Sequence, residues 1–201
     1  MLKKILKYFF VFLLILVSVY FIFFNKKYPI TVITHSFTPG DSLDSFNGVA
    51  VYNNGASIAT SHGKHYSVDS SCYYGKKWQC VEFIKRYYYD HLHFKFTDGF
   101  GNAKDFFDKE TKQGQLNKRR GLVQFINGLN EKPKVDDILV FDGSLGHVAI
   151  VTHVTDDEVE VIQQNIYMTP RQTFVLKYEN RNYTIGEDRK PFGWLRLRKD
   201  E

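Results

Sequence analysis

The chain contains two cysteines, and one of them, Cys80, stands where a Gly- and Lys-containing segment changes into a helical pattern. From position 81 onward, the stretch YYGKKWQCVEFIKRYYYDHL (residues 73–92) places apolar residues at three- and four-residue steps. This predicts a helix of about three turns that begins near Cys80. A thiol in the first helical turn lies near unpaired backbone N–H groups and the positive end of the helix dipole, and both favour the thiolate. Cys80 is therefore either a nucleophile or, like many free cysteines, a small apolar residue in the core.

A cysteine nucleophile needs a base, and His147 is the best placed histidine. It opens the most apolar strand pattern, GHVAIVTHV (residues 146–154), directly after the turn-forming DGSLG. An imidazole at this strand edge can meet both solvent and substrate. His153 shares the same strand face by two-residue alternation, but it lies at the far end beside TDDE, where we expect a polar surface role.

A catalytic imidazole is usually oriented by a third polar group. The next strand pattern, EVEVIQQN (residues 158–165), should return in a tight antiparallel hairpin towards the start of the strand that begins at His147. Gln163 and Asn165 share one face of this strand and are the candidates for the third role. The alternative for both is an amide that satisfies loop backbone at the strand end.

Taken in order, the segments GKKWQCVEFIKRYY, DDILVFDG, GHVAIVTHV and VIQQN resemble the CHAP domain, the cysteine, histidine-dependent amidohydrolase/peptidase family with a papain-like active site. Within that family they are most similar to the amidase domains of glutathionylspermidine synthetase/amidases. The similarity covers about residues 48–198. It implies a cysteine hydrolase in which Cys80 attacks an amide carbonyl, His147 is the general base, and a thioester is then hydrolysed by water.

The resemblance places Gln163 at the third position, where those amidases carry an acid. A carboxylate both orients the imidazole and favours its charged form, whereas an amide only orients it. The backbone N–H of Cys80 is the natural donor to the oxyanion, and we expect Gln79 and Asn165 to support the site.

Charge and composition exclude other functions. The formal net charge is +5, and five lysines in the first 27 residues account for it, with no acid among them: Lys3, Lys4, Lys7, Lys26 and Lys27. The rest of the chain is neutral overall, so it lacks the basic surface of a nucleic-acid-binding protein. We expect no nucleic-acid partner.

The sequence predicts no metal site and no cofactor. There is no CxxC pair, and His62, His65, His91 and His93 do not follow the spacing of zinc ligands. Cys72, eight residues before Cys80, is either a plain thiol or the partner of Cys80 in a reversible disulfide.

The first residues differ from the rest in composition. An apolar and aromatic run extends from Tyr8 to Phe24, interrupted only by Ser18, with lysines on both sides. Its length is near the lower limit of about 17 residues for a transmembrane helix. A cleaved signal peptide is the alternative, but no small-x-small cleavage site follows the run. The sequence thus predicts a single-pass membrane protein with a transmembrane anchor over residues 1–27 and its domain outside the cytoplasm.

After the anchor we expect a linker over residues 28–47 and one domain over residues 48–201. Short helices are predicted over residues 103–107 and 122–126, and strands separated by turns follow Pro133. The predicted fold class is α+β. It is a papain-like CHAP fold with N-terminal helices packed on an antiparallel β-sheet, preceded by one transmembrane helix.

The leading functional hypothesis is a membrane-anchored cysteine amidase or peptidase that cleaves amide bonds in peptides, such as those of a cell wall. A second hypothesis is an amidase for a glutathione–polyamine conjugate, for which Asp136, Asp137 and Asp142 could provide acids. A third is a non-catalytic CHAP-fold binding module, which the amide at Gln163 motivates.

Overall fold

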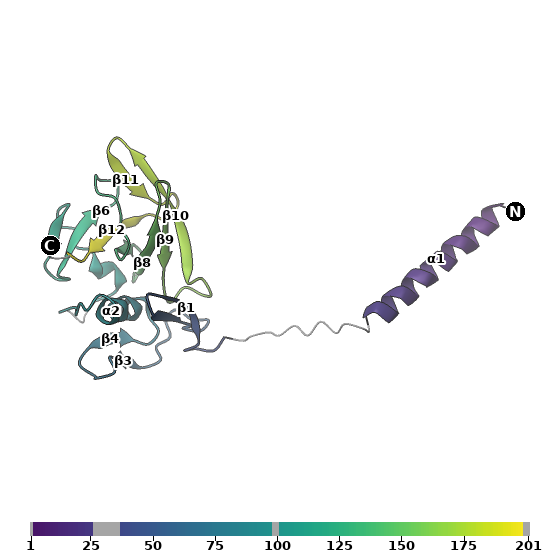
Figure 1. The fold of residues 1–201 in the computed structure, drawn as a ribbon, viewed down its shortest axis with the longest axis horizontal. Coiled ribbons are helices and arrows are strands. Elements are labelled where there is room, and N and C mark those ends of the chain that lie inside the picture. The colour runs from purple at the N-terminus through teal and green to yellow at the C-terminus, as the bar shows by residue number, and fades with distance from the viewer. Residues whose placement is uncertain (1, 26–36, 98–100, 199–201) are drawn as a thin grey trace. The chain divides into compact units, whose positions relative to one another are not determined.

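The computed structural model describes residues 2–25, 37–97 and 101–198 of the 201-residue chain. The chain divides into two compact units, Met1–Ser36 and Phe37–Glu201, and each is described by itself (Figure 1).

The first unit contains one helix, α1 (Leu2–Asn25), over the apolar run of the sequence. In the part of the chain that the structure describes, no helix is long and apolar enough to cross a membrane. The predictions of a transmembrane helix and of a single-pass membrane location are therefore wrong. The run from Tyr8 to Phe24 has 17 residues. At about 1.5 Å per helical residue it extends about 26 Å, short of a hydrocarbon core of about 30 Å.

The second unit is built on an eight-stranded antiparallel sheet with the strand order β11-β10-β9-β8-β7-β12-β6-β5 (Figure 1). Its strands are β5 (Gln115–Asn117), β6 (Leu122–Ile126), β7 (Ile138–Phe141), β8 (His147–Val154), β9 (Glu158–Ile162), β10 (Arg171–Glu179), β11 (Asn182–Ile185) and β12 (Pro191–Arg196). Two separate hairpins precede the sheet in the chain. They are β1 (Ser42–Phe46) with β2 (Val49–Tyr52), and β3 (Lys64–Tyr66) with β4 (Tyr73–Lys76).

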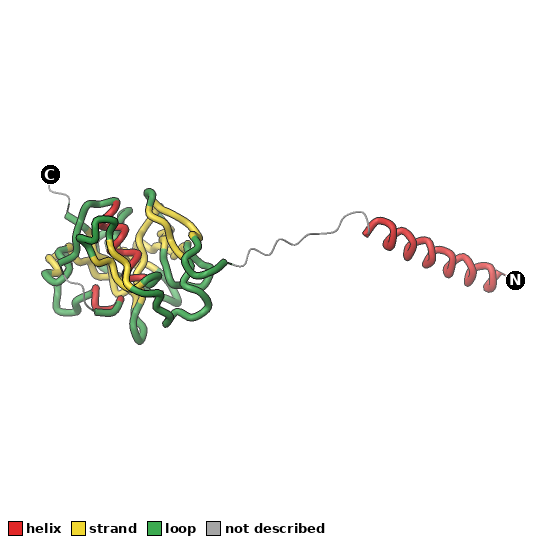
Figure 2. The backbone as a smooth tube through the Cα atoms, turned by 90° about the horizontal axis from the view of Figure 1, so that it is seen from below, coloured by secondary structure: helices red, strands yellow, loops and turns green. Residues whose placement is uncertain are grey.

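The fold class differs from the sequence prediction, because the second unit is mostly sheet and loop (Figure 2). Its described helices are only α2 (Cys80–Asp90) and the 3₁₀ helix η1 (Ala103–Phe106). The prediction of a layer of N-terminal helices packed on the sheet is therefore wrong. The segment Leu122–Ile126, predicted as a helix, is strand β6 and pairs with both β5 and β12. Five residues are too few to reveal a helical period, and Val, Phe and Ile suit a strand.

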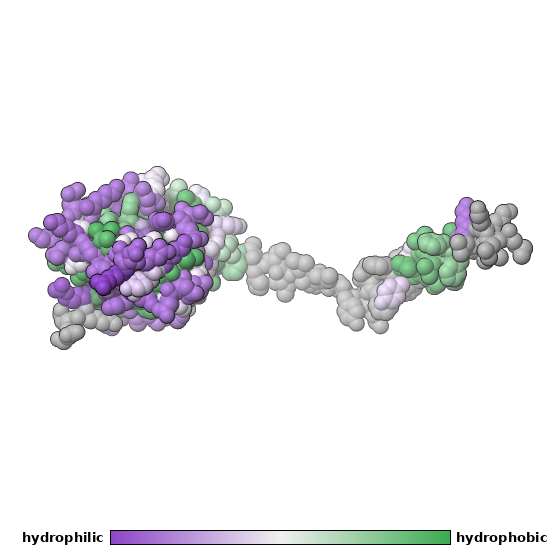
Figure 3. All heavy atoms as spheres, turned by 90° about the horizontal axis from the view of Figure 1, so that it is seen from above, coloured by the Kyte–Doolittle hydropathy of each residue, from purple (hydrophilic) through white to green (hydrophobic). Residues whose placement is uncertain are grey.

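The central strand β8 separates two hydrophobic cores. Val148 and Ile150 face the core that contains α2, whereas Ala149 and Val151 face the second core on the other side of the sheet. Both faces are buried, which explains why this strand is a nearly continuous apolar run rather than an alternating one. The outer surface in Figure 3 is mainly hydrophilic over this unit.

Helix α2 is buried on nearly all sides. It packs on β8 of the large sheet and also contacts β2 and β4 of the two hairpins. Its apolar face, including Phe83 and Ile84, is inaccessible to solvent, and the charged residues between the apolar positions are buried as well: Glu82, Lys85 and Arg86. The two hairpins cover the side of the helix that periodicity alone would leave in water.

Candidate active site

Cys80 is the first residue of α2, as the sequence predicts. The N-cap residue Gln79 is extended and makes no side-chain bond to the helix end. The backbone N–H groups of Val148, Val81 and Cys80 itself lie near the thiol and act to lower its pKa. The contact with Val148 brings the helix start to the first residues of β8, since Val148 directly follows His147.

The Cys80 thiol is neutral at physiological pH. Only 8% of the residue is exposed. Burial raises the pKa of the thiol to about 11, although the three N–H groups act in the opposite direction. The helix terminus favours the thiolate, as predicted, but the desolvation of the thiolate outweighs this effect.

His147 is the first residue of β8, and the turn before it depends on Gly146. Gly146 has φ +73°, and a Cβ there would lie 2.8 Å from the Cα of Lys104 in η1. The Lys104 N–H donates to the carbonyl of Leu145 at 3.1 Å. A residue without a side chain is thus required for η1 to pack on the turn and fix the position of His147.

Gln163 contacts the imidazole of His147. Its Oε1 lies 3.0 Å from Nε2 of His147. The amide nitrogen of Gln163 donates to the carbonyl of Thr169 at 3.2 Å and to Oε1 of Gln172 at 3.3 Å. These two bonds turn the amide oxygen towards the ring, so Nε2 of His147 carries the hydrogen. Nδ1 of His147 therefore keeps its lone pair and is the basic nitrogen.

The imidazole is neutral as well. Burial and the nearby charge of Arg189 lower the pKa of His147 to about 4, against the effect of the bond to Gln163. Among the described residues no hydrogen bond joins the Cys80 thiol directly to His147. Such catalytic bonds are often long without substrate and tighten when it binds.

Gln164 ties the end of β9 to the start of α2. Its Nε2 donates to the carbonyl of Gln79 at 3.0 Å and to Oε2 of Glu82 at 2.6 Å, while its Oε1 accepts from the N–H of Tyr52 at 2.8 Å. The residue next to Gln163 thereby holds the helix that carries Cys80. This role of Gln164 was not predicted from the sequence. The QQN segment could have indicated it, because strand alternation places Gln164 on the opposite face from Gln163 and therefore towards different partners.

The Glu82 carboxylate is the charged group among the contacts that hold the start of α2. Its carboxylate is inaccessible to solvent and accepts from Nδ1 of His65 at 2.8 Å and from Nε of Arg86 at 2.6 Å. Burial alone would raise the pKa of Glu82, but the bonds from His65 and Arg86 lower it below its ordinary value. The carboxylate is therefore ionised at neutral pH and locks the first turns of α2 to the β3–β4 hairpin.

The structure brings Gln79 and Asn165 together, but away from His147. Nδ2 of Asn165 donates to Oε1 of Gln79 at 2.7 Å. The Gln79 amide donates to the carbonyls of Thr60 at 2.6 Å and Ile58 at 3.2 Å. Both hydrogens of the Gln79 amide are thus used on the loop before β3, so in this arrangement the two residues support a loop beside the site.

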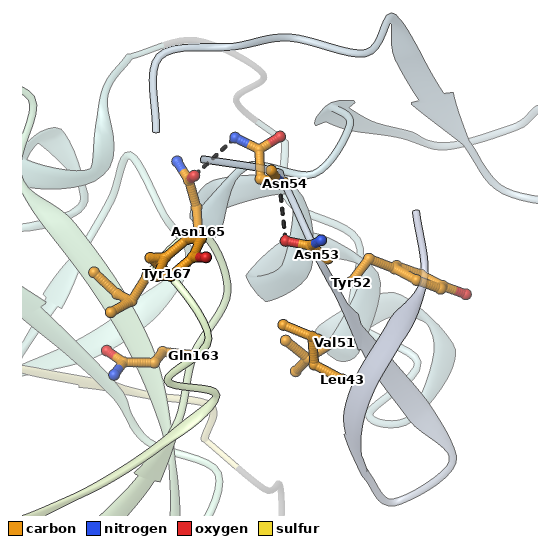
Figure 4. Close-up of a pocket in the computed structure, with 10 residues that line it drawn as sticks. Leu43, Val51, Tyr52, Asn53, Asn54, Gln163, Asn165 and Tyr167 are labelled. Carbon is orange, nitrogen blue, oxygen red and sulfur yellow. Dashed lines mark hydrogen bonds between the residues drawn. The ribbon is translucent and has the colours of Figure 1, made fainter. Parts of the chain in front are cut away.

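Asn54 completes that link. Its amide nitrogen donates to Oδ1 of Asn165 at 2.8 Å, and Figure 4 shows the two amides directed towards each other. Asn54, Asn165 and Gln163 line a cavity of about 10 Å³, too small for a substrate group. A substrate must therefore approach from outside this narrow space or displace the loop.

The other candidate residues lie elsewhere. Cys72 is a free, buried thiol just before β4. His153 is exposed near the far end of β8. Asp136 accepts from the hydroxyl of Tyr87, in the second half of α2, and Asp137 pairs with Arg196, so these two acids do not reach Cys80.

Comparison with known proteins agrees with this geometry. Residues 69–165 match the CHAP domain and include Cys80, His147 and Gln163. The bifunctional glutathionylspermidine synthetase/amidases of Escherichia coli (strain K12) and Shigella flexneri are each 30% identical in an alignment 139 residues long, which covers 61% of this chain and 22% of the relative. The trypanothione synthetase of Crithidia fasciculata is 26% identical in an alignment 144 residues long, which covers 64% of this chain and 22% of the relative.

The chain spans about a fifth of the length of these relatives. The CHAP match and the amidase relatives support the sequence prediction of a hydrolase that acts on amide bonds. They also confirm the family that the motifs around Cys80 and His147 indicated. Residues 69–165 of the chain therefore match the CHAP domain family.

Proposed function

We propose that this protein is a cysteine amidohydrolase or peptidase that cleaves an amide bond through a thioester on Cys80. The observation that carries the proposal is the orientation of His147. Its Nε2 is bound to Gln163, its Nδ1 keeps a free lone pair, and the backbone N–H of the next residue, Val148, lies near enough to the Cys80 thiol to lower its pKa. A thiol, a base and a group that orients the base are the parts that nucleophilic acyl transfer requires.

The reaction starts from a neutral pair. As Sγ of Cys80 attacks the amide carbon, Nδ1 of His147 takes the thiol proton, and the backbone N–H of Cys80 donates to the developing oxyanion. The imidazolium then gives this proton to the leaving nitrogen, the C–N bond breaks, and a thioester remains. Water, deprotonated by Nδ1, attacks the thioester and releases a carboxylic acid and the free thiol.

The neutral resting pair explains how an amide can occupy the third position. Gln163 has only to fix the ring tautomer, because the imidazole carries no charge before the reaction begins. In this proposal Gln79 and Asn165 support the site through the loop that they contact.

The relatives suggest one substrate and the family another. Two of the relatives are glutathionylspermidine synthetase/amidases, so an amide of glutathione is one candidate, and a crosslinking peptide of a cell wall is the other. The test is to incubate the protein separately with glutathionylspermidine and with peptidoglycan stem peptides, and to identify products by mass spectrometry. We expect two fragments whose summed mass exceeds the substrate by one water. A folded protein that binds one of these compounds without cleaving either of them would instead be a binding module.

A further inference from the structure

A cavity of about 450 Å³ lies at the end of α2 that is distant from Cys80. Its wall includes Leu92, which follows the last turn of the helix. The helix has 11 residues, so at about 1.5 Å per residue its two ends are about 15 Å apart. The cavity is therefore separate from the candidate active site, where the space beside Gln163 is only about 10 Å³.

Most of the wall of this cavity is apolar. It is formed by β6, the end of β12, the loop before β7 and the segment after α2. The apolar residues that line it are Leu92, Val123, Phe125, Val135 and Leu197. Cavities of this volume with mainly apolar walls and a few polar groups are typical of sites for small molecules. The apolar part of a ligand would lie against this wall.

Two of the charged residues on the wall already satisfy each other. Nη2 of Arg196 lies 2.7 Å from Oδ2 of Asp137 and also donates to the carbonyl of Lys132 at 2.9 Å. Arg196 pairs in addition with Glu131. The Asp137 carboxylate accepts from the backbone N–H of Lys134 at 2.8 Å. Arg196 and Asp137 therefore need no ligand to offset their charges.

Asp136 and Arg198 line the same cavity without a charged partner. Among the described residues neither of them takes part in an ion pair, whereas Lys134 lies 3.7 Å from Glu131. Oδ1 of Asp136 accepts from the hydroxyl of Tyr87 at 2.7 Å, which fixes the position of the carboxylate. The wall thus presents one carboxylate and one guanidinium that a ligand of opposite charges could pair with.

We propose that this cavity binds a free amino acid with a large apolar side chain, whose ammonium group pairs with Asp136 and whose carboxylate pairs with Arg198. The side chain of the ligand packs on the apolar wall. A zwitterion supplies both charges in one molecule, and the planar N–H fork of an arginine suits a carboxylate. An amine or an acid alone would leave one of the two protein charges unpaired. The site does not involve Cys80, so it goes beyond the proposed hydrolysis.

The test is a calorimetric titration of the full-length protein with three indole compounds. They are tryptophan, indole-3-propionate, which lacks the ammonium group, and tryptamine, which lacks the carboxylate. None of them contains an amide bond, so the result does not depend on the proposed function. We expect tryptophan to bind about tenfold more tightly than either analogue, the effect of one charge-assisted contact. No saturable binding of tryptophan, or equal affinities for the three compounds, would overturn the proposal.

Three variants place the ligand in this cavity. Asp136→Asn keeps an oxygen for Tyr87, and Asn tolerates the φ of +75° at this position, so the fold should be retained. It should abolish the preference for tryptophan over indole-3-propionate. Arg198→Ala should abolish the preference over tryptamine. Val123→Phe puts a larger side chain into the cavity from a strand that accepts aromatic residues, and it should weaken the binding of all three compounds about tenfold.

Asp188→Asn and Arg181→Ala are the matched controls, because both residues are exposed and neither lines the cavity. Both controls should bind the three compounds as the wild type does. Wild-type binding by Val123→Phe with an unchanged circular dichroism spectrum would contradict the proposal. So would wild-type preferences in both Asp136→Asn and Arg198→Ala, or an equal loss of binding in the controls.

Discussion

The residues of the site suit a reaction that begins without charge separation. Burial raises the pKa of Cys80 to about 11 and lowers that of His147 to about 4, with Arg189 adding to the second effect. Between these values the thiol and the imidazole are both neutral. Gln163 fits this state, because an acid in its place would favour the imidazolium.

Replacing Gln163 by Glu should change the pH dependence rather than abolish activity. The carboxylate raises the pKa of His147, so the acid limb of kcat/KM, expected near pH 4 in the wild type, should move up by about 1–2 pH units. Measuring kcat/KM against pH checks this. Gln172→Glu is the control, since Gln172 bonds only to the amide nitrogen of Gln163 and should shift the limb less. Complete loss of activity in a folded Gln163→Glu protein would mean that another residue orients the base.

At the scale of elements, the segments that present the two reactive residues could be predicted from sequence. The spacing of apolar residues after Cys80 predicted where the helix begins, and the turn before His147 predicted where the strand begins. The burial of Glu82 and Arg86 could not be predicted, because it depends on how the two hairpins before α2 pack on the helix, which the helical period does not show. The same limit applies to β6, where the choice between helix and strand depends on its pairing with β12.

The turn that positions His147 should be sensitive to a single methyl group. Gly146→Ala places a Cβ against the Lys104 backbone at a positive φ, and we expect a loss of about 3 kcal/mol of unfolding free energy. Gly63→Ala is the control, with φ +92° and nothing within 4 Å of the new Cβ, and it should cost only about 1 kcal/mol. Urea denaturation measures both. Equal losses would show that η1 does not depend on this close approach.

At the scale of the whole molecule, the site belongs to one compact unit. All the residues that hold Cys80 and His147 lie within Phe37–Glu201, and the large sheet with its two cores lies there too. The prediction of a membrane location was wrong at this scale. A run of 17 apolar residues is at the lower limit of length for a transmembrane helix, and composition alone does not decide whether such a run crosses a membrane.

A protein that lacks residues 1–36 should therefore fold and react as the complete chain does. We expect its melting temperature to lie within about 2 °C of the full-length value, because the unit has its own cores. Calorimetry of both proteins, with the rate of Cys80 alkylation as a second readout, provides the check. A truncated protein that does not melt cooperatively would show that the first residues are part of the folding unit.

The central claim is that Cys80 is the nucleophile. The most direct measurement compares product release by the Cys80→Ala and Cys72→Ala variants. Reactions quenched with acid are also examined by mass spectrometry for an acyl group on the Cys80 peptide. Both cysteines are free and buried, so each variant removes one thiol from a similar environment. The account predicts no product and no adduct in folded Cys80→Ala, and product with a thioester on Cys80 in Cys72→Ala. Wild-type product release by Cys80→Ala would contradict it.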